Sequence, residues 1–389
     1  MYSHNQMHGF ERAMHSCEYV IVLDDDIKLH PGTIRAWVEE LESDARVLAA
    51  SGYAFEYIGK GVTGLASYFA MLWRCMASNG FSDPLDRPAN VWGGAMIFRS
   101  KELRRNVYGL TDAWRDGGYS EDFITLSMAR FHNRSLAVPK SAIFPNELGE
   151  LQFDRFWNFL CRQIFVLTQT YATGAQRFIA IGANGVNASM HAWIFAACVT
   201  ATLLTPFLLA TAAIRVIGLA RLDHASAIRE ADDLVSAGPY ATLGVVGSCA
   251  SSGAVPCAFA FWLSLLVVGF GFKRMLTSFS KLCNVLSPHG YDNEPIDVSH
   301  ISVLRLCLAY MCYAPLIPAA TLVTFASPAI VWSGVNFHVT NGRVSKMERK
   351  DGKGPKPVGE WYSVPREVSL ETALREMAQY RMQQEGIVR

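Results

Sequence analysis

Three consecutive carboxylates, Asp24, Asp25 and Asp26, follow a short apolar run at Tyr19–Leu23. Buried parallel strands read as continuous apolar runs, and ligands of α/β sheets bind at the carboxyl ends of such strands. Three adjacent acids repel one another unless a cation screens them, and carboxylate oxygens suit a hard divalent cation that also binds substrate phosphates. The alternative is an Asp-rich turn that caps the next helix, although a cap needs only one Asp.

A second acidic pair, Glu121 and Asp122, follows a loop that contains two glycines and ends in Ser120. Ser120 can cap a helix, and the first turn of a helix favours carboxylates, so an ordinary helix start is one interpretation. Together with the upstream Asp cluster at the end of a strand, the acidic pair favours a second interpretation, in which both sites take part in catalysis. One acidic site could hold a metal while the other supplies a general base.

Two further motifs could contact a phosphorylated ligand. Gly93 and Gly94 lie in the apolar run Val91–Phe98. Paired glycines allow the backbone to approach a ligand closely. The alternative is an ordinary tight turn, which has the same sequence pattern. Arg162 and Gln163 follow a group of aromatic residues in a predicted helix. A guanidinium matches the oxygens of a leaving diphosphate, whereas the alternative is a membrane-interface helix with a snorkelling arginine.

Alternating strand and helix patterns predict an α/β domain with a mostly parallel sheet at residues 1–175. Strands are predicted at Tyr19–Leu23, Val47–Ala50, Val91–Phe98 and Ser135–Val138. Helices are predicted at Pro31–Leu41, Leu65–Met76, Glu121–Phe131 and Phe153–Tyr171. Only 18 residues precede the first strand. A doubly wound nucleotide-binding half has one or two more βα units there, so we expect the domain to be incomplete at its N-terminus.

The placement of charge predicts a membrane region at residues 176–334. Asp, Glu, Lys and Arg are absent from three long stretches, namely 178–214, 234–272 and 306–342. Each exceeds the roughly 20 residues that cross a bilayer. Transmembrane segments are therefore predicted near 190–214, 248–272 and 306–333. Prolines in the second and third segments predict kinked or re-entrant helices.

The remaining features bound the class of protein. Of the 389 residues, 51% are hydrophobic, which fits a membrane protein, and a net charge of +1 gives no nucleic-acid footprint. Nine cysteines without a CxxC pair predict reduced, buried thiols rather than a zinc site or a disulfide framework. A soluble tail is predicted at 335–389, with a basic solvated linker at Lys346–Lys356 and an amphipathic helix from Ser369 to about Gln384.

Taken in chain order, these motifs resemble the family-2 inverting glycosyltransferases, and more narrowly the plant-type branch of the ceramide glucosyltransferases. The resemblance covers residues 4–175 most fully and the membrane part loosely. The matching stretches are His4–Gln6, Tyr19–Gly32 (YVIVLDDDIKLHPG), Trp92–Met96 (WGGAM), Arg115–Asp122 (RDGGYSED), Phe156–Leu167, Trp332–Val335 and Asn341–Val344. From the resemblance we expect that the region with the family's first signature Asp and its N-terminal membrane anchor is missing from this chain. Phe165-Val166 replaces the RW of the family's (Q/R)xxRW element, which argues against the processive polysaccharide synthases.

The resemblance implies a GT-A-type α/β domain on the cytosolic face of the endoplasmic reticulum or Golgi, anchored by membrane helices. It implies transfer of glucose from UDP-glucose to the primary hydroxyl of ceramide, with inversion, in sphingolipid biosynthesis. Asp24 and Asp26 match the acids that hold Mg²⁺ or Mn²⁺ and the donor diphosphate. Asp122 matches the general base, with Glu121 as the second choice. Arg162 and Gln163 match the start of (Q/R)xxRW, and Gly93 and Gly94, in the matching WGGAM stretch, are candidates for contact with the donor.

Three other functions remain as hypotheses. The acceptor could be a polyprenyl phosphate or a growing polysaccharide instead of ceramide. The chain could also be a non-catalytic membrane fragment, since we expect the uridine-binding half to be missing. A glycosidase with a carboxylate pair is disfavoured by the membrane segments and by the strand-end position of the acids.

Overall fold

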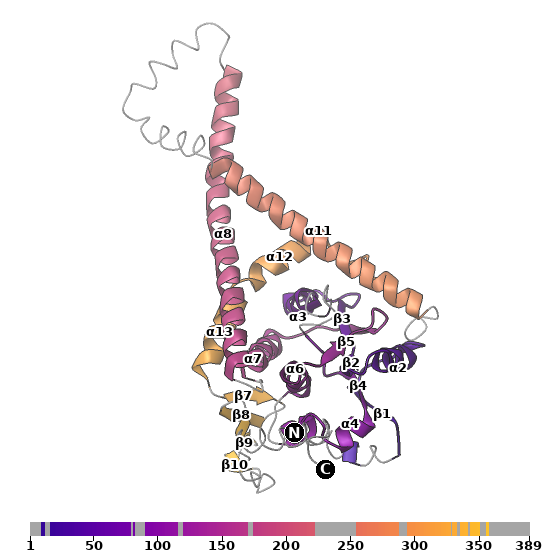
Figure 1. Cartoon of the computed structure of the whole chain (residues 1–389). Coiled ribbons are helices and arrows are strands. Elements are labelled where there is room, and N and C mark those ends of the chain that lie inside the picture. Colours follow the sequence, from indigo (N-terminus) through magenta and orange to yellow (C-terminus); the bar gives the residue numbers. More distant parts are fainter. Residues whose placement is uncertain are drawn as a thin grey trace.

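The structure is a computed structural model. It describes residues 9–11, 16–78, 81, 90–115, 120–169, 174–221, 254–287, 294–327, 329–332, 335–340, 343–350 and 355–357. Within these ranges the chain forms an α/β domain, a set of long apolar helices and a small antiparallel sheet beside the domain (Figure 1).

The main sheet has four strands. Their order is β1 (Tyr19–Leu23), β4 (Ala95–Arg99), β2 (Val47–Ser51) and β5 (Ser135–Ala137). β4 runs antiparallel to both of its neighbours, whereas β2 and β5 are parallel. The prediction of a mostly parallel sheet is therefore wrong for two of its three pairs, because a buried apolar run carries no information about direction. The reversal pairs Leu23 with Ala95, so the end of β1 lies beside the start of β4.

A second, two-stranded parallel sheet pairs β3 (Tyr53–Ile58) with β6 (Ile143–Leu148), and neither strand was predicted. β3 follows β2 after Gly52 alone, so the two strands read as one apolar stretch. β6 contains Pro145, and a proline argues against a strand when the sequence is read alone.

Helices cover the sheets much as the sequence predicts. α2 (Thr33–Ser43), α3 (Leu65–Ala77), α6 (Glu121–Phe131) and α7 (Phe153–Gln169) lie within a few residues of the predicted bounds. Two short helices, α4 (Ser100–Arg104) and α5 (Leu110–Arg115), were not predicted. Both are shorter than the two turns over which a helical period can be recognised.

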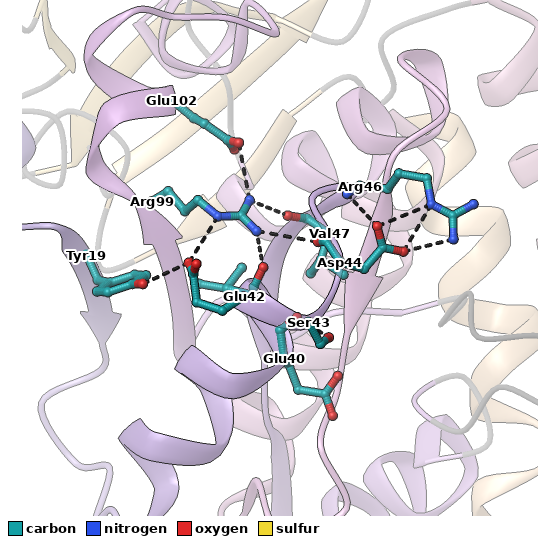
Figure 2. Close-up of polar contacts among 10 residues, drawn as sticks. Tyr19, Glu40, Glu42, Ser43, Asp44, Arg46, Val47, Arg99 and Glu102 are labelled. Carbon is teal, nitrogen blue, oxygen red and sulfur yellow. Dashed lines mark hydrogen bonds and ion pairs between the residues drawn. The ribbon is translucent and has the colours of Figure 1, made fainter.

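Arg99, the last residue of β4, anchors the C-terminal end of α2 to the main sheet (Figure 2). Its guanidinium donates to the carbonyl oxygens of Leu41 and Val47, the latter at 2.8 Å. It also pairs with Glu42 at 3.5 Å and Glu102 at 3.2 Å. A cation is favourable at a helix C-terminus, where the backbone carbonyls carry partial negative charge. The network thereby fixes the helix that follows the Asp cluster.

Among the residues that the structure describes, three helical segments are long and apolar enough to cross a membrane. They are Gly174–Pro206 within α8 (Gly174–Arg221), Ala258–Leu286 within α11 (Ala254–Leu286), and Val303–Ala326, which joins α12 (Val303–Tyr313) and α13 (Leu316–Ala326). The prediction of three apolar segments is confirmed. The break between α12 and α13 falls at Ala314 and Pro315, in agreement with the predicted kink.

The bounds of all three segments differ from prediction, and the first runs from Gly174 to Pro206 rather than from about 190 to 214. α11 continues through Lys273 and Arg274 instead of ending before them, and its second half packs on the α/β domain. There the centre of the Phe279 ring lies 5.4 Å from that of Tyr53 and 5.5 Å from that of Phe55, which explains why the helix extends beyond its apolar stretch. The third segment ends at Ala326 rather than 333.

The small sheet is antiparallel and consists of β7 (Ala329–Trp332), β8 (Val335–Thr340), β9 (Arg343–Lys350) and β10 (Pro355–Pro357). β9 and β10 occupy the segment predicted as a basic solvated linker, so that prediction is wrong. Backbone pairing with β8 outweighs the charge of β9. Buried side chains of β7 and β8 share a core with Phe98 and Phe165 of the α/β domain. The helix predicted from Ser369 lies outside the described residues.

Candidate functional site

The end of β1 and the start of β4 meet at the turn Gly93-Gly94. The backbone N–H of Asp24 donates to the Gly94 carbonyl at 2.9 Å. A Cβ atom added to Gly94 would lie 2.6 Å from Asp24 Oδ2 and closer still to the Trp92 ring. Only glycine therefore leaves room for the Asp24 carboxylate over this turn.

Asp122 reaches the same turn from the first turn of α6. The backbone N–H of Gly93 donates to Asp122 Oδ2 at 3.2 Å. Asp122 Oδ1 accepts from the Phe123 N–H at 2.8 Å and from the Ser120 hydroxyl. Glu121 lies against the other side of Gly93, where an added Cβ would overlap its Oε1. Two acids that are 98 positions apart in the chain, Asp24 and Asp122, therefore face one pair of glycines.

The carboxylates at this turn affect one another electrostatically. Burial raises the pKa of Asp24, and the negative charges of Asp26 and Asp122 raise it further. Burial also raises the pKa of Asp122, although the three hydrogen bonds that it accepts act in the opposite direction. Asp25 and Asp26 are exposed. Bringing a cation to this turn would relieve the repulsion among the acids.

The donor set fits a cation that is held partly by substrate. Within the described ranges, no group of three or more His, Cys, Asp or Glu side chains is placed to hold a metal ion. Asp24 and Asp26 supply two carboxylates, which is fewer than an all-protein cage needs. Mg²⁺ is usually bound in this way, by one or two carboxylates together with waters and substrate phosphates.

Arg162 and Gln163 lie on α7, and both are half-buried. The Arg162 guanidinium carbon lies 5.8 Å from the centre of the Phe159 ring. Gln163 makes no hydrogen bond to Asp24 or Asp122 in the described part of the chain. The structure thus brings the glycines and the two acidic sites together, and places the α7 pair on a neighbouring element.

A buried ion pair next to the acids was missed in the sequence. Arg74 Nε, on the last turn of α3, donates to Glu56 Oε1 of β3 at 2.9 Å, and the two side chains are 19% and 8% exposed. The positive charge of Arg74 lowers the pKa of both Asp24 and Asp122. A signal was present, because Arg74 is the only charged residue in the otherwise apolar α3 sequence.

Aromatic side chains connect the domain to the membrane helices. Phe156 of α7 lies 5.4 Å from Phe69 of α3 and 6.4 Å from Tyr313 of α12, and Tyr313 also contacts His191 of α8 at 6.0 Å. Trp157 stacks on Phe153, which is 52% exposed. These contacts therefore join α3 and α7 of the domain to the apolar helices α8 and α12.

A scan against protein-family models finds no family that matches the chain, and a search of the curated proteins finds no match. Parts of the motifs described above also lie outside the described residues, namely His4–Gln6, the loop 116–119, Ser333-Gly334 and Asn341-Gly342. The chemistry of the site is therefore inferred from the two acidic positions, the glycine turn and the apolar helices that pack on the same domain.

Proposed function

We propose that the protein is an inverting glycosyltransferase that transfers glucose from UDP-glucose to ceramide, and so takes part in sphingolipid biosynthesis. The observation that carries the proposal is the meeting of Asp24 and Asp122 at the Gly93-Gly94 turn, in a domain joined to apolar helices. A strand-end acid and a helix-start acid at one turn provide separate positions for donor binding and for proton transfer.

The donor diphosphate binds at the carboxyl end of β1. Asp24 and Asp26 would hold Mg²⁺ or Mn²⁺, which supplies charge neutralisation to a departing diphosphate. Gly93 and Gly94 carry no side chains, so the nucleotide sugar can approach the backbone of the turn. The hydrogen bond from the Asp24 N–H to the Gly94 carbonyl fixes the backbone from which the Asp24 carboxylate extends over the turn.

Asp122 acts as the general base. Its raised pKa makes it a stronger base than an exposed aspartate, and its Oδ2 accepts only the N–H of Gly93 among the described residues, which leaves a lone pair for a proton. The acceptor O–H bond breaks and its proton moves to Asp122. The oxygen bonds to the anomeric carbon from the face opposite the diphosphate. The bond from that carbon to the diphosphate oxygen breaks, and its electron pair leaves with UDP. Glu121 is the second candidate base.

The acceptor is a membrane lipid. A two-tailed lipid keeps its chains in the bilayer, so its hydroxyl must enter from the side on which α7 and α3 meet α8 and α12. Lys273 and Arg274 follow the second apolar stretch, which favours a cytosolic position for this end of α11 and for the domain beneath it. We place the protein in the membrane of the endoplasmic reticulum or the Golgi.

The test is a transfer assay in membranes that contain the chain, with labelled UDP-glucose and a total lipid extract. We expect a labelled product with the mobility of glucosylceramide. Asp122→Asn should abolish transfer and leave UDP binding nearly intact. If the labelled product is a polyprenyl phosphate sugar or a polymer, ceramide is not the acceptor. If Asp122→Asn turns over at the wild-type rate, Asp122 is not the general base.

A further inference from the structure

The ion pair between Arg74 and Glu56 lies beside the proposed donor site. The Tyr53 hydroxyl donates to the backbone carbonyl of Arg74 at 3.0 Å, and the N–H of Gly52, the residue before Tyr53, donates to the carbonyl of Ala95, the residue after the glycine turn, at 3.2 Å. These contacts link Arg74 to the start of β4 beside the turn, and its positive charge acts on Asp24 and Asp122. The pair therefore lies near the acids assigned to donor binding and proton transfer. A structural salt bridge needs no such location.

Most of the N–H donors of Arg74 make no hydrogen bond within the described residues. A guanidinium has five N–H donors, and in the described part of the chain Arg74 uses the one on Nε, for Glu56. Its side chain is 19% exposed, so the terminal nitrogens are not sealed in the core. The Arg74 guanidinium carbon lies 5.7 Å from the centre of the Phe159 ring. The Arg162 guanidinium carbon lies 5.8 Å from the centre of the same ring. Glu56 and Phe159 thus hold the head group from two sides.

The α7 positions that would carry the Arg-Trp pair of the family element are Phe165 and Val166. These side chains are 1% and 8% exposed and belong to the core shared with β7 and β8. Apolar side chains in that place cannot bind phosphate oxygens. A donor with a diphosphate still needs a cation from the protein, since guanidinium binds such oxygens in a fork.

We propose that the terminal nitrogens of Arg74 bind the diphosphate of the nucleotide-sugar donor, with Glu56 as the positioning residue that orients the guanidinium. This inference rests on the proposed function and adds to it the residue that binds the diphosphate. It also explains why an ion pair is buried in an otherwise apolar contact between α3 and β3, where two apolar residues would serve stability equally well.

The test measures UDP binding rather than transfer, by calorimetry on the full chain in nanodiscs with Mn²⁺ present. Arg74→Met should weaken UDP binding by about 10- to 100-fold, the loss expected for charge-assisted hydrogen bonds. Arg74→Lys keeps the charge without the fork and should give an intermediate loss. Thermal unfolding is recorded for each variant.

Arg74→Met leaves Glu56 buried without a counter-charge, which alone could prevent folding. The double variant Glu56→Gln/Arg74→Met removes that charge, and we expect it to recover thermal stability without recovering UDP binding. Arg99→Met is the matched control, because Arg99 is 18% exposed and paired with glutamates, but lies at the far end of β4 from the glycine turn. It should lose stability and keep the wild-type Kd for UDP in its folded fraction.

The outcomes separate the two proposals. If the wild type binds UDP and the double variant binds it within twofold of wild type, Arg74 has only a structural role and the inference is wrong, while the proposed function stands. If the wild type does not bind UDP with either Mn²⁺ or Mg²⁺, the proposed function and the inference about Arg74 are both wrong. Weak binding by both Arg74 variants, with normal binding by Arg99→Met, supports the inference.

Discussion

Gly94→Ala probes the contact on which the site depends. The new Cβ would lie 2.6 Å from Asp24 Oδ2, whereas ordinary contact begins near 3.4 Å, so the carboxylate has to move by about 0.8 Å. The Trp92 ring lies on the same side of the turn and limits any other relief. A misplacement of about 1 Å costs on the order of 100-fold in rate. We therefore expect kcat/KM for glucose transfer to fall by about two orders of magnitude.

The same substitution should leave the protein folded. Overpacking costs about 1–3 kcal/mol, which is less than the stability of a typical domain. The assay is labelled transfer per folded molecule, with thermal unfolding measured in parallel. Gly149→Ala is the control, because an added Cβ there meets no atom within 4 Å. Transfer by Gly94→Ala at the rate of Gly149→Ala would refute the placement of Asp24 at the reacting centre.

Three further predictions follow from the same structure. Because burial raises the pKa of Asp122 above its ordinary 3.8, activity should be lost as pH falls through the raised pKa, and an acidic limb of the pH–rate profile at or below pH 3.8 would contradict this. EDTA should abolish transfer and Mn²⁺ or Mg²⁺ restore it, whereas Asp24→Asn or Asp26→Asn should raise the metal concentration needed, as measured by metal titration. Arg99→Met should cost about 3–5 kcal/mol by denaturant unfolding, because it leaves Glu102 partly buried without its cation.

The elements that position the site were largely readable from local patterns. The strand Tyr19–Leu23 and the helix Glu121–Phe131 have the predicted bounds, because an apolar run and a helical stretch that follows Ser120 each have clear ends. Strand direction was not readable, because a strand buried on both faces looks the same in either sense. The antiparallel course of β4 is nevertheless what brings Gly94 to Asp24.

The rest of the site depends on contacts between residues that are distant in sequence. The partners Glu56 and Arg74 are 18 positions apart, on β3 and α3, and each looks like an isolated charge in its own apolar segment. The strand β9 was concealed by its charge, since Lys346 and Glu348 suggest a solvated linker when the partner strand is unknown. Such pairings follow from the packing of whole elements, which local patterns do not contain.

The most direct measurement of the central claim is the identity of the lipid product and the configuration of its sugar. The chain is incubated in vesicles with ceramide, Mn²⁺ and UDP-glucose, and the lipid is analysed by mass spectrometry and NMR. We predict β-linked glucosylceramide from the wild type and none from Asp122→Asn. A glycolipid with the α configuration, or no glycolipid from a wild-type chain that binds UDP, would contradict inverting transfer to ceramide.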